Sequence, residues 1–161
     1  MTVAVFIIAW ICTLAGDYFL SVTQTHFTLG ILLFCIVQTM YMIHLKPTPK
    51  ELALRGTIFV ILVGVLAIIN MFSFQNVLAV LDITMLGINA FKAWKDRGQK
   101  LLLSIGLTLF FCCDICVGLR SIVPYELSTL MLVLIWTFYL PSQVLIVIYG
   151  IKTMRYMKGK Q

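Results

Sequence analysis

Long apolar runs separated by short polar connections dominate the pattern of side chains along the chain. The runs are bounded by charged or turn residues and lie at about 3–22, 27–45, 57–73, 75–91, 101–119 and 126–150. Their lengths are close to the roughly 20 apolar residues that an α-helix needs to cross the hydrocarbon core of a bilayer. The pattern therefore predicts an all-α fold, a polytopic transmembrane helical bundle of about six spans, with the whole chain, 1–161, in a single domain.

The basic residues are distributed unequally between the connections. When the six runs cross the membrane in alternation, only Arg120 falls on one side. The other side holds the remaining eleven of the twelve Lys and Arg residues: Lys46, Lys50, Arg55, Lys92, Lys95, Arg97, Lys100, Lys152, Arg155, Lys158 and Lys160. By the positive-inside rule the basic side is cytoplasmic, so both termini are expected in the cytoplasm.

The composition agrees with a membrane protein and leaves no room for a separate soluble domain. Of the 161 residues, 61% are hydrophobic and 11% are charged, whereas about a quarter of the residues of a soluble domain are charged. The net charge of +6 comes from basic clusters beside the apolar runs, where contacts with lipid headgroups are expected. We therefore expect membrane lipids as partners, no nucleic acid, and a multi-pass location in a bacterial inner (plasma) membrane.

Three carboxylates lie inside the apolar runs, at Asp17, Asp82 and Asp114. At ~1.5 Å of rise per residue, each falls about 20 Å from the cytoplasmic end of its helix, and Asn70 in the third run reaches a similar level. A carboxylate at the bilayer centre costs about 2.5–3.5 kcal/mol, so these side chains should face the bundle interior or a wet cavity. The pattern predicts one polar layer that forms a site, although the same residues could serve only to hold helices together.

Other candidate chemistry is limited. Cys113 and Cys116 have a zinc-like C-x-x-C spacing, but no second cysteine pair or histidine accompanies them, so no metal and no cofactor is predicted. Pro141 falls inside the last run, where it should bend the helix and free a backbone carbonyl. Its neighbours then become candidates for lining a cavity: Tyr139, Ser142 and Gln143.

Three blocks of residues resemble the motifs of the YhhN family of lysoplasmalogenase-like membrane proteins. The first block resembles the G-D-x-x-L, F-x-x-G-x-x-x-F-x-x-x-H-x-x-Y signature of that family, with Gly16, Asp17, Leu20, Phe27, Gly30, Phe34, Gln38 and Tyr41. The second is similar to G-x-x-x-F-x-x-S-D, with Gly106, Phe110, Cys113 and Asp114. The third is similar to Y-x-x-x-Q-x-x-I, with Tyr139, Gln143 and Ile146. Two positions depart from the pattern, because Gln38 replaces a histidine and Cys113 replaces a serine.

The resemblance implies a hydrolase that cleaves the vinyl ether bond of lysoplasmalogens, lysophospholipids that yield a fatty aldehyde and a glycerophospho-headgroup. It makes Asp17 and Asp114 the expected catalytic pair, one as general acid and the other as the negative charge that stabilises an oxocarbenium-like cation. The expected substrate-binding residues are Gln38, Tyr41, Asn70, Asp82, Tyr139 and Gln143.

Two other classes of function fit the same residues. A small transporter would use the aspartate layer to bind a cation or relay protons, although transporters typically contain repeated halves and the sequence shows no repeat. A non-catalytic membrane bundle would use the aspartates only to join helices, which the departures at Gln38 and Cys113 permit.

Overall fold

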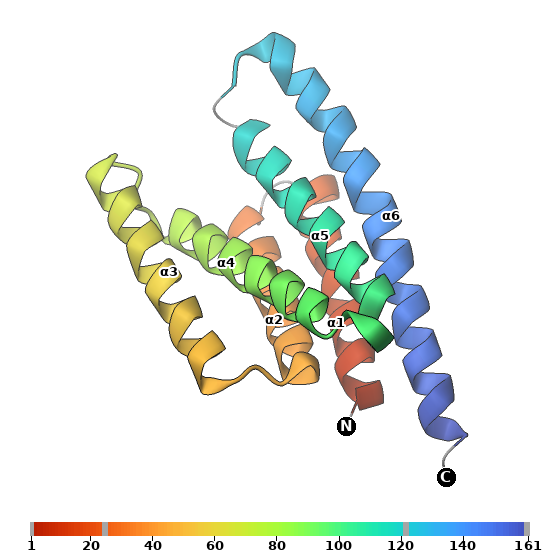
Figure 1. Ribbon diagram of the computed structural model, residues 1–161. Helices are drawn as coiled ribbons and strands as arrows, with labels where there is room; N and C mark the ends of the chain where they lie inside the picture. Colours follow the sequence, from red (N-terminus) through yellow and green to blue (C-terminus); the bar gives the residue numbers. More distant parts are fainter. Residues whose placement is uncertain (1, 24–25, 121–122, 160–161) are drawn as a thin grey trace. The chain divides into compact units, whose positions relative to one another are not determined.

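The computed structural model describes residues 2–23, 26–120 and 123–159, and within these ranges it is helical, with no β-strand (Figure 1). The elements follow in the order α1 Thr2–Asp17, the π-helix η1 Tyr18–Thr23, α2 Phe27–Leu45, α3 Pro49–Ile68, α4 Phe74–Lys95, α5 Arg97–Arg120 and α6 Tyr125–Lys158. In these ranges six helical segments are long and apolar enough to cross a membrane, and the first of them, Val3–Leu20, continues from α1 into η1. The predictions of an all-α fold and of six spans are confirmed, whereas the orientation of the termini stays a prediction.

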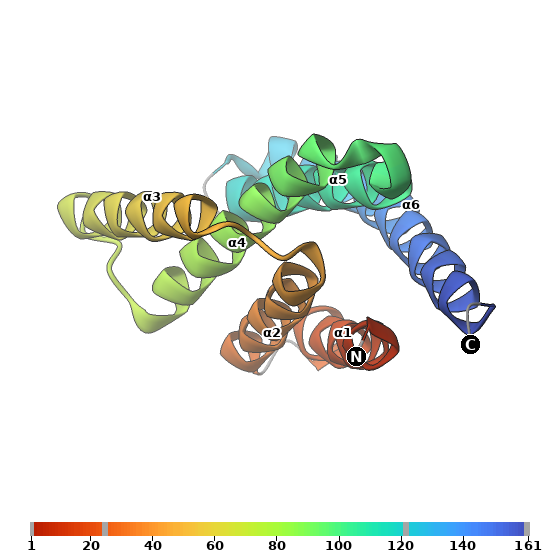
Figure 2. The same cartoon turned by 60° about the horizontal axis from the view of Figure 1, so that its bottom comes forward.

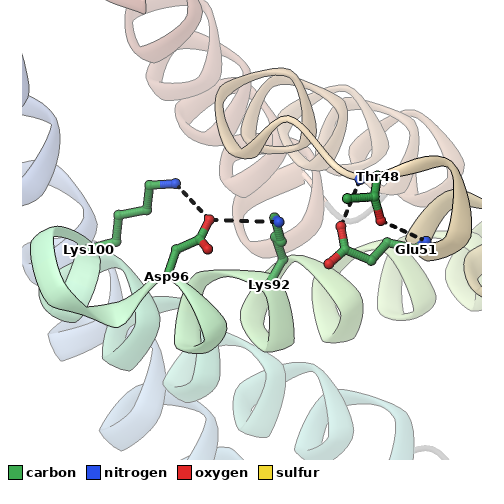
Figure 3. Close-up of polar contacts among 5 residues, drawn as sticks. All are labelled: Thr48, Glu51, Lys92, Asp96 and Lys100. Carbon is green, nitrogen blue, oxygen red and sulfur yellow. Dashed lines mark hydrogen bonds and ion pairs between the residues drawn. The ribbon is translucent and has the colours of Figure 1, made fainter.

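The third span begins earlier than the hydrophobic pattern predicts, at Pro49 rather than at residue 57. A capping box starts it: the Thr48 side chain accepts a hydrogen bond from the Glu51 backbone N–H at 3.3 Å, and Glu51 Oε2 accepts one from the Thr48 N–H at 2.7 Å (Figure 3). Pro49 occupies the first helical position, where its missing N–H has no cost. The charged stretch that the pattern assigns to a connection is therefore the first two turns of α3.

The same span also ends earlier, at Ile68, and this corrects the expected place of Asn70. Asn70 has a left-handed backbone with φ 57°, and its N–H donates to the Ala67 carbonyl while the Met71 N–H donates to the Leu66 carbonyl. These are the two hydrogen bonds of a Schellman motif, in which asparagine is a common left-handed residue. Asn70 is exposed in the turn between α3 and α4, so its predicted place within the third helix is wrong.

The chain divides into two compact units, Met1–Asn89 and Ala90–Gln161, with the boundary inside α4. In the first unit α1 and α2 lie side by side, as Figures 1 and 2 both show. In the second unit α5 and α6 lie side by side in the same two views. The expectation of a single domain over residues 1–161 stays a prediction.

Polar contacts of the second unit form the junction between α4 and α5. Asp96 Oδ2 pairs with Lys100 Nζ at 3.1 Å and with Lys92 Nζ at 3.8 Å (Figure 3). Lys100 has a non-helical backbone, φ −115° and ψ 18°, so a short turn precedes the apolar part of α5. The Trp94 indole N–H also donates to Thr108 Oγ1 at 2.8 Å. Most of the basic stretch expected as a connection is therefore folded into the ends of the two helices.

Candidate functional site

Asp17 is the last residue of α1 and directly precedes the π-helix η1. Its side chain is half-buried. A π-helical turn widens the helix and changes the direction in which successive side chains point, and such turns occur often at functional sites. The GDYFL segment therefore combines a carboxylate inside an apolar span with an uncommon local backbone.

Close packing surrounds Asp17 in the first unit, because α1 and η1 meet α2 at two glycines. A Cβ atom added to Gly16 would lie 3.0 Å from the ring of Phe34, and one added to Gly30 would lie 2.6 Å from Leu20 Cγ. Each glycine thus accommodates a large side chain of the facing segment. Asp17 lies in sequence between Gly16 and Leu20, so it is next to residues that make these close contacts.

Asp114 occupies a comparable setting in the second unit. At Gly106 an added Cβ would lie 2.8 Å from Ile146 Cγ1 and 3.2 Å from a backbone carbonyl of α6. One turn further along α5 the Phe110 ring packs edge-on against Tyr139, with centroids 5.9 Å apart. Asp114 follows after another turn and is half-buried. The second and third motif blocks thus pack against each other. Tyr139 contacts Phe110, which lies one turn of α5 before Asp114.

Asp82 is the most buried of the three aspartates, with 8% of its surface exposed. It lies on α4 one turn after Leu78, whose carbonyl accepts a hydrogen bond from the Cys35 thiol at 3.7 Å. Asp82 Oδ1 has no hydrogen-bond partner among the residues that the structure describes. At ~1.5 Å per residue, Asp17 lies about 22 Å from the start of α1 and Asp82 about 20 Å from the end of α4. Asp82 is therefore deep within its span, whereas Asp17 lies near the end of the span Val3–Leu20. A layer shared with Asp114 stays a prediction.

A polar network that the sequence pattern does not reveal joins three helices of the first unit. Asn89 on α4 donates from Nδ2 to the backbone carbonyl of Gln38 at 2.9 Å and to Gln38 Oε1 at 3.2 Å. Asn89 Oδ1 in turn accepts from Arg55 Nη2 on α3 at 3.1 Å. Gln38 and Asn89 are fully buried and Arg55 is 6% exposed. The hydrophobic pattern assigns Arg55 to a connection, and the capping pattern Thr48-x-x-Glu51 is the signal that would have placed it inside a helix.

The other expected binding residues are distributed between the two units. Tyr41 is buried in the first unit, with its ring centroid 6.4 Å from that of Phe6. Gln143 is half-buried on α6 in the second unit, where the helix continues through Pro141. Gln143 Nε2 is buried without a hydrogen-bond partner in the described part of the chain. These two residues stay predicted binding residues.

A mostly apolar groove of about 450 Å³ lies at the N-terminal ends of α2 and α4 in the first unit. It is lined by His26, Phe27, Thr28, Leu29, Leu32, Phe74, Gln75 and Leu78. Leu78, in the lining of the groove, lies one turn before Asp82 on α4. In residues 2–23, 26–120 and 123–159, no group of three or more His, Cys, Asp or Glu side chains is arranged to hold a metal ion.

Six membrane-spanning helices with carboxylates inside the spans define a multi-pass integral membrane protein. The model of the YhhN family matches residues 1–149, and the chain therefore belongs to the YhhN family. The resemblance seen in the three motif blocks is confirmed. No curated protein and no solved structure matches the chain.

Proposed function

We propose that the protein is a membrane-embedded hydrolase that cleaves the vinyl ether bond of lysoplasmalogen-like lysophospholipids. The family match over residues 1–149 carries this proposal, because it contains the three motif blocks and both motif aspartates, Asp17 and Asp114. A bacterial inner membrane is the proposed location. Membrane-embedded carboxylates suit a substrate whose reactive bond lies just below the lipid headgroups.

Two aspartates supply what this reaction needs. The carboxylic acid of one aspartate protonates the β-carbon of the vinyl ether, and the electrons of the C=C bond form the new C–H bond. The ionised carboxylate of the other stabilises the resulting oxocarbenium ion and orients a water molecule, which adds to the cationic carbon and loses a proton. The hemiacetal then collapses to a fatty aldehyde and a glycerol hydroxyl. One water is consumed, and the first aspartate regains its proton.

Packing around the aspartates supports this assignment. In each unit a motif glycine lets two helices approach closely. Gly16 directly precedes Asp17, and Gly106 lies two turns of α5 before Asp114. Catalytic groups supported by rigid helix pairs hold their orientation better than groups on loops. Tyr139 and Gln143 are proposed to position water or the headgroup near Asp114, and Asp82 is proposed as a substrate-binding residue of the first unit.

The apolar groove beside Leu78 is the proposed place for the alkyl chain of the substrate. Its lining is rich in Phe and Leu side chains, and its volume of about 450 Å³ falls within the range of small-molecule sites. Leu78 of its lining lies one turn of α4 from Asp82. We propose that a chain in the groove directs its polar end toward this carboxylate.

A non-catalytic bundle is the second candidate, and one observation favours it. Gln38 stands where the family pattern has a histidine, and its side-chain oxygen accepts a hydrogen bond from Asn89 inside the core. A buried amide pair of this kind joins helices without any chemistry. Turnover of a defined substrate distinguishes the two candidates.

The test uses purified, detergent-solubilised protein and a defined lysoplasmalogen, with aldehyde release as the readout. Wild type should release aldehyde, and Asp17→Asn and Asp114→Asn should each lower turnover by roughly 10²- to 10⁴-fold, the usual contribution of a general acid or base. Asp96→Asn is the matched control, because Asp96 pairs with lysines at the α4–α5 junction. Equal unfolding midpoints would show that the variants are folded. Absence of turnover in wild type, or full activity in both variants, would contradict the proposal.

A further inference from the structure

Arg55 carries a positive charge into the interior of the first unit. It lies in the second turn of α3, inside the span Pro49–Ile68, and only 6% of its surface is exposed. The two buried residues of this helix are Glu51 and Arg55, whereas apolar side chains such as Val60, 67% exposed, point outward. α3 thus presents its charged face to the protein and its apolar face to lipid.

The guanidinium group is only partly satisfied. Arg55 Nη2 donates to Asn89 Oδ1 at 3.1 Å, but Nε and Nη1 are buried and have no hydrogen-bond partner among the described residues. Glu51, one turn earlier, attracts the guanidinium electrostatically, while its Oε2 accepts from the Thr48 N–H. A buried charge with two unused donor nitrogens is costly, and such groups in native proteins usually meet an ion, a ligand or water.

Gln38, which binds the same Asn89 side chain as Arg55, also has an unused donor atom. Gln38 is fully buried, and its Nε2 has no partner in the described part of the chain. Its Oε1 and its backbone carbonyl are both occupied by Asn89 Nδ2. Arg55 and Gln38 therefore offer three unused donor nitrogens around Asn89, which suits a ligand that only accepts hydrogen bonds.

Gln38, Arg55 and Asn89 form a donor cluster. Its depth in the membrane corresponds to the inner boundary of the lipid headgroup region. At ~1.5 Å per residue, Arg55 lies about 9 Å from the start of α3, Asn89 about 9 Å from the end of α4 and Gln38 about 10 Å from the end of α2. All three helix ends lie on the side that carries the basic connections. Basic pockets between spans on that side are typical receptors for phosphate-bearing headgroups.

We propose that Arg55, oriented by Asn89 and assisted by Gln38, binds the oxygens of a phosphate group. Under the proposed function, on which this part of the inference rests, that phosphate belongs to the lysophospholipid headgroup. Asp82 lies about 10 Å from Asn89 along α4, toward the membrane centre. A lipid held by its phosphate at Arg55 would extend its glycerol and ether bond toward Asp82. Arg55 is then a substrate-binding residue that distinguishes phosphate-bearing lipids from lipids without phosphate.

The experiment measures binding and needs no cleavage. Solubilised wild type and variants are titrated with a saturated alkyl-ether lysophospholipid, with the matching alkylglycerol that lacks phosphate, and with inorganic phosphate. The shift in thermal unfolding midpoint is the readout. Wild type should prefer the phosphate-bearing lipid, and Arg55→Gln should weaken its binding by roughly 10- to 100-fold, since a hydrogen bond to a charged group contributes that much. Binding of the alkylglycerol should not change.

Arg155→Gln is the matched control, because it removes the same charge from an exposed position on α6 and should preserve the preference. Asn89→Asp provides a second variant if Arg55→Gln does not fold. A carboxylate there would pair with Arg55 and compete with phosphate, so the preference should again be lost. If inorganic phosphate is the only one of the three ligands that gives an Arg55-dependent shift, the site is supported and its ligand is free phosphate.

Some outcomes would overturn the inference. If wild type binds both lipids equally, or if Arg55→Gln or Asn89→Asp leaves the preference intact, Arg55 only joins helices. Failure of the proposed function is distinguishable, because wild type would then leave vinyl ethers intact and still show the Arg55-dependent preference. Conversely, turnover with no such preference would remove the phosphate site and leave the hydrolase.

Discussion

At the residue scale, glycines of the motif blocks determine how closely the helices approach. Gly30 accommodates Leu20, and Gly106 accommodates Ile146 and the backbone of α6. All four residues belong to the motif blocks, so these blocks are packing pairs as well as carriers of the aspartates. Gly16 meets Phe34 and Gly30 meets Leu20, so each segment contributes one glycine and one large side chain, four residues apart in the sequence.

A substitution at Gly30 tests this packing. Gly30→Ala would place a Cβ atom 2.6 Å from Leu20 Cγ, and such overpacking costs about 1–3 kcal/mol. Gly64→Ala is the control, because nothing lies within 4 Å of its added Cβ and alanine favours a helix. Thermal unfolding in detergent should show a lower midpoint for Gly30→Ala and an unchanged or higher one for Gly64→Ala. Equal midpoints would refute the close α1–α2 contact at this glycine.

At the element scale, α2 and α3 show why some spans coincide with hydrophobic runs and others begin elsewhere. The run 27–45 coincides with α2, because charged or turn residues border it on both sides. The third run misses the start of α3, because Lys50, Glu51 and Arg55 suggest a solvated connection. The local capping box contains enough information to correct that start. The pairing of Arg55 with Asn89 does not follow from local sequence, since the two residues are 34 positions apart and meet only in the folded unit.

The capping box gives a prediction for this helix. Thr48→Ala removes the side-chain acceptor of the Glu51 N–H and should destabilise the protein by about 1 kcal/mol, the usual cost of losing an N-cap. Thr57→Ala is the control, because its hydroxyl bonds within α3 to the Ala53 carbonyl at an exposed position, and it should change stability by less than about 0.5 kcal/mol. Denaturant or thermal unfolding in detergent measures both. A Thr48→Ala protein as stable as Thr57→Ala would show that α3 does not depend on this cap.

At the scale of the whole molecule, the charge distribution predicts the orientation. Eleven of the twelve Lys and Arg residues lie on the side of the termini, and that asymmetry is large enough to direct insertion. The spans α1 to α6 preserve the alternation even though several boundaries move, because their number is six as predicted. The family was predictable only through the motif blocks, since hydropathy alone fits a transporter or an inert bundle equally well.

Reporter fusions test the orientation. Green fluorescent protein attached after Gln161 should fluoresce, because it folds on the cytoplasmic side. Alkaline phosphatase inserted at Ser73, in the turn between α3 and α4, should be active because that turn faces the other side. The reciprocal fusions are the controls and should be silent. The opposite activities would place the basic connections outside and contradict the predicted orientation.

The central claim, that the protein protonates the carbon of a vinyl ether, is tested most directly by the mass of the aldehyde released in heavy water. Deuteron transfer from the catalytic aspartate should place one deuterium on the carbon next to the carbonyl. Rapid reduction of the aldehyde to the alcohol prevents later exchange at that carbon. Wild type should yield aldehyde with one deuterium there. Aldehyde without deuterium at that carbon, or no aldehyde from wild type, would contradict the account.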